Sequence, residues 1–309
     1  MDTHYTLDAS LRAAGEALLQ AAVRTCSTQW SAISTAVPTG RPARAIVDPE
    51  ALLLASMALA KYEARLWRVC QIWARSGSRL LSVQRVKNLT GNVIATPEEY
   101  LAGFAWIAVT DGNDNRWHKL ARREAPRSSR WEPPATPLVN HPAALTLRLR
   151  LGMGVGIKAD VLCFLVGMVG VHATIQEIAL ATGYYGRAVR RAVEELAAAR
   201  FVQSRSTSPA SFRVDMNKWH QPLDFDLDDP PAWRSWAAGY GFVVAVLDWI
   251  RSELPDSETV AVSAARRLMT THSEALAAAG MAPLPSGATG LEPFRRVLEE
   301  FARYLEAAV

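Results

Sequence analysis

The chain has little of what extracellular, membrane and metal-binding proteins depend on. Its 309 residues contain three cysteines and six histidines, all far apart, so we expect no disulfide framework, no metal site and no other cofactor. No uncharged apolar run reaches the roughly 18 residues that a membrane span needs. The first residues also lack the basic and apolar regions of a signal peptide. A cytoplasmic protein without membrane contact is therefore predicted.

Motifs for catalysis and for nucleotide binding are missing as well. The glycine-rich stretch 152–156 does not fit Gly-x-Gly-x-x-Gly, and neither Gly-Lys-Ser nor Gly-Lys-Thr occurs in the chain. The acidic stretch 224–229 is followed by Pro230 and Pro231, which rule out a calcium-binding loop. No pairing of a nucleophile with a base stands out. We therefore predict that the protein is not an enzyme.

Charge is unevenly distributed, although the total formal charge is only +4. The net formal charge is +3 over residues 1–110, +7 over 111–219 and −6 over 220–309. Half of the residues are hydrophobic and 21% are charged, which is typical of a folded globular chain. The positive excess in the middle of the chain indicates where a polyanion would bind.

Proline-rich segments divide the chain into three folded parts and two linkers. We predict an N-terminal helical domain over 1–112, a basic linker over 113–142, a central domain over 143–219, an acidic linker over 220–231 and a C-terminal helical domain over 232–309. The last helices carry wide apolar stripes, which suit either a dimer interface or an intramolecular bundle.

The central domain carries the most informative pattern. Residues 157–166 form an apolar run with charges only at its start, which predicts a buried helix. Thr174-Ile175-Gln176-Glu177 is a capping box, in which the Thr hydroxyl and the Glu carboxylate each accept a hydrogen bond from an otherwise unpaired backbone N–H. A second helix therefore starts there, and Gly183 can end it in the left-handed conformation.

A third helix and a hairpin complete this domain. The helix runs from about Gly186 to Ala199, with apolar residues on its inner face and Arg187, Arg190 and Arg191 at the head of its outer face. Residues 201–205 and 211–215 have the composition of two strands. Helix, helix, short turn, helix and hairpin is the order of a winged helix-turn-helix.

The stretch resembles the winged helix-turn-helix DNA-binding domains of bacterial transcriptional regulators, broadly those of the MarR and ArsR groups. The residues that carry the resemblance are Thr174 to Gly183, Arg187 to Val193 and Leu196 to Val202, within a region of about a fifth of the chain. In one respect the sequence departs from that pattern. The capping position of the third helix, usually Ser or Thr, is held by Tyr185 and Gly186.

The resemblance implies a mainly α protein with a central winged helix-turn-helix, whose β-hairpin wing is small, between N-terminal and C-terminal helical domains. It also implies a homodimer that binds double-stranded DNA sequence-specifically. The helix starting near Gly186 would enter the major groove, and the wing would contact the backbone. The residues expected at the DNA are Thr174, Tyr184, Tyr185, Gly186, Arg187, Arg190, Arg191, Arg205, Ser206, Thr207, Ser208 and Arg213.

Electrostatics supports the three arginines of the third helix as the reading residues. Arg187 lies in the first turn, where the helix dipole disfavours a cation, and it repels Arg191 four residues on. A phosphate or a guanine edge would reverse both effects. The plainer interpretation is that Arg190 and Arg191 pair with Glu194 and Glu195 on a solvated helix.

Other interpretations of the whole chain stay open. The winged helix could be a protein-interaction module in a larger complex, such as a defence or toxin–antitoxin system. A small-molecule effector could bind among the Trp-rich helices of a regulator. Residues 80–89 predict a short helix with Gln84, Arg85, Lys87 and Asn88 on its polar face, which is either a second DNA-reading helix or a solvated one.

Overall fold

The computed structural model describes residues 2–37, 43–122, 135–206, 208–252, 257–282 and 290–307. Thr207 of the predicted wing and most arginines of the predicted basic linker lie outside the described residues. Within them the chain is mainly helical with one small antiparallel sheet, which confirms the mainly α prediction.

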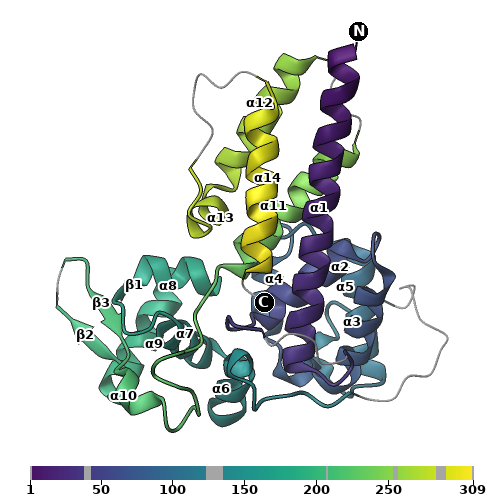
Figure 1. Cartoon of the computed structure of the whole chain (residues 1–309). Helices are drawn as coiled ribbons and strands as arrows, with labels where there is room; N and C mark the ends of the chain where they lie inside the picture. The colour runs from purple at the N-terminus through teal and green to yellow at the C-terminus, as the bar shows by residue number, and fades with distance from the viewer. Residues whose placement is uncertain are drawn as a thin grey trace.

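The elements follow one another in three groups along the chain (Figure 1). The first group comprises α1 (Asp2–Ile33), α2 (Pro49–Leu59), α3 (Ala64–Ser76), η1 (Ser78–Leu80), α4 (Val83–Leu89), α5 (Glu98–Thr110) and η2 (Asn115–Trp117). The second comprises η3 (Pro142–Ala144), α6 (Leu145–Met153), α7 (Ile157–Gly167), β1 (Ala173–Thr174), α8 (Ile175–Thr182), α9 (Gly186–Ala198), β2 (Gln203–Arg205), β3 (Ser211–Arg213) and α10 (Met216–Trp219). The third comprises α11 (Trp236–Arg251), α12 (Glu258–Thr271), α13 (Ser273–Ala278) and α14 (Glu292–Glu306).

The first and third groups share one hydrophobic core, and we call them together the helical body. Ile250 of α11 packs against Gly15 of α1, while Tyr240 lies beside Cys26 at the other end of the same two helices. α1 and α11 are therefore antiparallel. Arg24 of α1 pairs with Glu306 at the end of α14, so α14 runs beside α1 in the same direction. These helices project together from the rest of the molecule (Figure 1).

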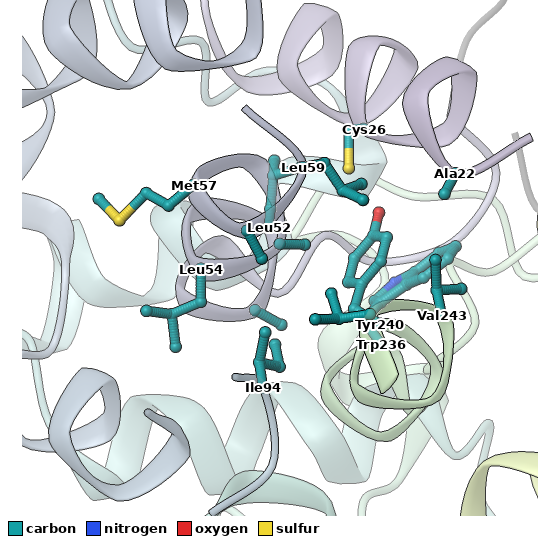
Figure 2. Packing of buried hydrophobic residues seen from close by; sticks show 14 of the residues in the cluster. Ala22, Cys26, Leu52, Leu54, Met57, Leu59, Ile94, Trp236, Tyr240 and Val243 are labelled. Carbon is teal, nitrogen blue, oxygen red and sulfur yellow. The ribbon is translucent and has the colours of Figure 1, made fainter. Parts of the chain in front are cut away.

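Large side chains fill the centre of this core without a disulfide. Figure 2 shows the Cys26 thiol pointing toward the Tyr240 hydroxyl, next to Leu52 and Leu59 of α2. All three cysteines of the chain are buried and unpaired. Burial raises the pKa of the Cys26 thiol to about 12, so this thiol is neutral at physiological pH and acts as a small apolar group.

The second group forms its own core, and we call residues 145–225 the central unit. Buried side chains of α6, α7, α8 and α9 meet those of the three-stranded sheet, whose strand order is β1-β3-β2 with both pairs antiparallel. In the register of the sheet, Phe212 of β3 lies opposite Ala173 of β1 and Ser204 of β2. The buried Phe212 side chain fixes this sheet to the core.

An extended segment on each side joins the central unit to the helical body. The Ile46 backbone N–H donates to the Ala232 carbonyl at 2.9 Å, and the Trp236 indole donates to the Ile46 carbonyl at 2.8 Å. Gly167 ends α7 against this seam, where a Cβ would come within 2.8 Å of the Trp233 backbone nitrogen. A side chain at position 167 would therefore push the two parts apart.

None of the helices within the described part of the chain is both long and apolar enough to cross a membrane.

Candidate nucleic-acid interface

Local sequence positions α8 as predicted. The Thr174 side chain accepts a hydrogen bond from the Glu177 backbone N–H, and the Glu177 carboxylate accepts from the Thr174 backbone N–H at 2.7 Å, which confirms the capping box. Gly183 ends the helix in the left-handed conformation with a φ of 70°. The Thr174 hydroxyl is thus already engaged in the fold, with Glu177 as its partner.

The turn between α8 and α9 points its two tyrosines in opposite directions. The Tyr184 hydroxyl donates to the Asp160 carboxylate of α7 at 2.8 Å. Burial, together with the Asp160 charge, raises the pKa of Tyr184 well above its usual range, so the hydroxyl stays a donor. Tyr185 is 77% exposed. The structure therefore holds Tyr184 half-buried and leaves Tyr185 and Gly186 exposed.

α9 presents arginines on its outer face and buries Val189, Val193 and Leu196 on its inner face, as the spacing predicted. Arg187 and Arg190 are exposed, and neither forms an ion pair with any described residue. Tyr185, the N-cap residue, gives no side-chain hydrogen bond to the start of α9, and the first turn holds no acidic residue. The positive end of this helix is therefore open to solvent.

The third arginine of this face is partly neutralised. Arg191 donates to the Glu195 carboxylate at 2.9 Å, and Lys158 of α7 reaches the same carboxylate at 2.7 Å. These hydrogen bonds, from Lys158 first and Arg191 second, lower the pKa of Glu195. The Arg191 side chain is still 84% exposed, so the pair is a surface one and holds it weakly.

The hairpin that follows α9 carries the remaining predicted contacts. Arg205 on β2 and Arg213 on β3 are both exposed, as are Ser206 and Ser208 at the turn. Arg213 donates to the Gln203 side chain at 2.9 Å, which holds it along the outside of the hairpin. The structure thus places the wing residues on the surface of the same unit as the α9 arginines.

Beneath this surface lies a buried ionic cluster that sequence reasoning missed. Arg150 of α6 donates to both oxygens of Glu50, at 2.6 and 2.9 Å, and its Nε donates to Asp160 at 2.7 Å. Arg85 of α4 donates to both oxygens of Asp48, at 2.6 and 2.9 Å, and to Glu50 at 2.5 Å. All five residues are buried, and we call them the ionic cluster.

The arginine charges of the ionic cluster lower the pKa of the Asp160 carboxyl group. Burial alone would raise the pKa of Asp160, but the charges of Arg150 and Arg85 outweigh it and lower that pKa below its usual value. The same carboxylates outweigh burial at the two guanidinium groups and raise their pKa values. Two guanidinium groups and three carboxyl groups meet here, and their hydrogen bonds satisfy most of the buried donors.

The ionic cluster ties the helical body to the α8–α9 turn. Glu50 and Arg85 belong to the body, whereas Arg150 and Asp160 belong to the central unit. Arg85 also donates to the Thr182 carbonyl at 2.7 Å, at the end of α8. The turn that carries α9 is thus held at a fixed position relative to the body.

The placement of Arg85 differs from the one the sequence indicated. Residues 80–89 predicted a helix with Arg85 on a polar, solvated face, but Arg85 is buried and only Gln84 and Lys87 are fully exposed. Arg85 is buried because it binds the carboxylates of Asp48 and Glu50 at the N-terminus of α2, more than thirty residues earlier in the chain. A usable signal was that Arg150 and Asp160 each have apolar neighbours on both sides.

Comparisons with known proteins give this surface no precedent. The described residues contain no group of His, Cys, Asp and Glu side chains that could hold a metal ion. Neither protein-family models, nor curated proteins, nor solved structures gave a match to this chain.

Proposed function

We propose that the protein is a sequence-specific DNA-binding regulator and that residues 157–219 act as its winged helix-turn-helix. The observation that carries the proposal is the set of exposed cations without carboxylate partners on α9 and the wing. Arg187, Arg190 and Arg205 make no ion pair with any described residue. A polyanion would supply the missing partners.

The arrangement of the elements supports this use of the unit. α7, β1, α8, α9, β2 and β3 follow in the order of a winged helix, and β1 joins the hairpin to make a three-stranded sheet. α9 packs its apolar face on α7 and α8 and turns its arginines outward. In this architecture the third helix is the one that enters a major groove.

The start of α9 suits a phosphate group. Its first N–H groups have no side-chain cap, and the helix dipole adds positive potential at the same end. Arg187 lies in that first turn and would join the backbone N–H groups in holding one phosphate. Arg190 and Arg191 lie about one helical turn further along α9 and would then reach base edges. For this, Arg191 would leave its weak surface pair with Glu195.

Two copies of the chain fit a two-fold symmetric operator in this proposal. In a dimer the two α9 helices would enter successive major grooves about 34 Å apart. If a small-molecule effector binds to the helical body, the ionic cluster would transmit the effect of its binding to α9. The regulator acts without catalysis and resides in the cytoplasm, with double-stranded DNA as its partner.

The proposal is tested by selecting bound duplexes from random DNA and titrating the winner with salt. Wild-type protein should enrich one sequence, and the variant Arg187→Ala with Arg190→Ala should lose that enrichment. Losing the phosphate contact of Arg187 should flatten the slope of log K against log salt by about 1, and losing the base contact of Arg190 should remove the sequence preference. Enrichment and slope that stay unchanged in the double variant would contradict the proposal, as would failure of the wild type to enrich any sequence.

A further inference from the structure

α4 of the helical body lies directly against the turn that leads into α9. The Asn88 amide donates to the Gly183 carbonyl at 2.9 Å, and Arg85 donates to the Thr182 carbonyl at 2.7 Å. Leu89 fills the space beside Gly183, where its Cδ2 would lie 3.2 Å from an added Cβ. The Ser82 hydroxyl at the cap of α4 lies 3.3 Å from the Tyr184 hydroxyl. These contacts fix α4 along the whole turn.

Two polar side chains of α4 remain available on its outer side. Gln84 and Lys87 are exposed, and Lys87 forms no ion pair with the residues that the structure describes. Lys61, another lysine of the body, instead pairs with Asp248 at 2.6 Å. Gln84 donates one amide hydrogen to Asn88, which leaves its second amide hydrogen for a ligand. The outer side of α4 is thus positive and carries hydrogen-bond donors.

The head of α9 lies close to α4, because only a short segment joins it to Gly183, whose carbonyl accepts from Asn88 of α4. Arg187 lies four positions after Gly183, and a fully extended chain spans at most about 14 Å over that interval. The B-DNA major groove is about 12 Å wide. A duplex that received α9 in its groove would have a flanking phosphate strand within reach of the exposed side of α4.

We propose that α4 is a second DNA-contacting element, in which Lys87 and Gln84 bind the sugar-phosphate backbone beside the groove that α9 enters. The inference rests on the proposed function and adds the helical body to the binding surface. Base reading stays with α9, whereas α4 contributes contacts that do not depend on sequence. The buried Arg85 serves α4 by holding it at the correct place rather than by touching DNA.

The test compares three variants on the duplex selected by the wild-type protein and on a scrambled duplex of the same length. Lys87→Ala with Gln84→Ala removes the α4 contacts, and Arg187→Ala with Arg190→Ala removes those of α9. Arg267→Ala is the matched control, since it removes an exposed cation from α12, an element outside both α4 and the central unit. Each salt slope is measured, and hydroxyl-radical footprints record the protected backbone.

The α4 variant should lower the salt slope by about 1 on both duplexes, because a single lysine contact to phosphate is lost. Its footprint should lose protection on one flank while the preference for the selected sequence remains. A slope and footprint equal to those of the Arg267→Ala control would overturn the role of α4 and leave the proposed function standing. If the α9 variant also matches the control, or no protein binds, the proposed function and this inference both fail.

Discussion

The arginines of the ionic cluster and those of α9 are the same residue type in opposite situations. Arg85 and Arg150 are buried and donate to both oxygens of a carboxylate, whereas Arg187 and Arg190 are exposed and have no carboxylate partner among the described residues. The first pair holds the helical body and the central unit together. The second pair contributes nothing visible to the fold, which is why we assign it to a ligand.

In this comparison the environment, rather than the residue type, separates arginines that support the fold from arginines that are open to a ligand. A buried guanidinium group loses its hydration and must recover that free energy from fixed partners. An exposed one keeps its water and can exchange it for a phosphate group. Variants of the two classes should therefore behave in opposite ways: loss of folding stability in the cluster, and loss of binding on α9.

The largest expected effect is that of Arg150→Ala. The substitution leaves Glu50 and Asp160 buried without their shared cation, and removing one partner of such a cluster costs about 3–5 kcal/mol in the free energy of unfolding. Urea denaturation followed by circular dichroism measures the change. Arg190→Ala is the control on α9 and should alter stability by no more than about 0.5 kcal/mol. An equal loss in the free energy of unfolding for the two variants would contradict the difference between the buried and the exposed arginines.

Acid should weaken the ionic cluster next. The pKa of Asp160 lies below its usual value of about 4 in the folded protein, so its ionised form stabilises the fold above that pH. This stabilisation is lost as the pH falls through the lowered pKa. We expect the urea concentration at the unfolding midpoint to decrease when the pH falls below about 4. The decrease should be less steep in Asp160→Asn, which is already less stable than the wild type at neutral pH. Parallel pH profiles for the two proteins would argue against a role for Asp160.

Thr174→Ala tests whether a predicted DNA contact is instead a structural residue. The hydroxyl caps α8, so its removal should cost about 1 kcal/mol in the free energy of unfolding. Thr174→Ser keeps the cap and should be close to wild type. DNA affinity measured on both variants separates the two roles: a loss in the Ala variant alone, without a matching loss of stability, would assign the hydroxyl to DNA.

The smallest effect is expected for Arg191→Ala. Its ion pair with Glu195 is exposed to solvent and spans one helical turn, so it contributes little to stability. The matched variant Glu195→Gln breaks the same pair from the other side and also releases Lys158. In the DNA-binding assay, Arg191→Ala should lower the affinity for DNA, whereas Glu195→Gln should raise it, since it removes a negative charge from the surface. A stability loss in either variant as large as that of Arg150→Ala would place this pair with the buried ones.

Features written in short stretches of sequence were predictable. The capping box of α8, its end at Gly183 and the inward face of α9 are all confirmed. Each depends on residues within one or two helical turns, so the backbone hydrogen bonds that determine it are local. The exposed positions of Arg187 and Arg190 follow from the same periodicity.

Features that depend on distant partners were not predictable from one sequence. Nothing in residues 48–50 or in α6 indicates that Glu50 meets Arg150, because the two are 100 positions apart. The shared core of α1, α11 and α14 is hidden for the same reason, since each helix alone shows only an apolar stripe. Arg85 lies in a stretch whose polar residues are typical of a surface helix, and only the packed structure shows that Arg85 is buried.

The shared core also has a consequence for how the chain matures on the ribosome. α1 to α5 leave the exit tunnel first, yet the helices that complete their packing end only at Glu306. At about 5–20 residues per second, roughly ten to forty seconds pass between those events. During that interval the central unit can already fold, while the apolar side of α1 stays uncovered, so nascent chains of intermediate length should be the species that molecular chaperones capture.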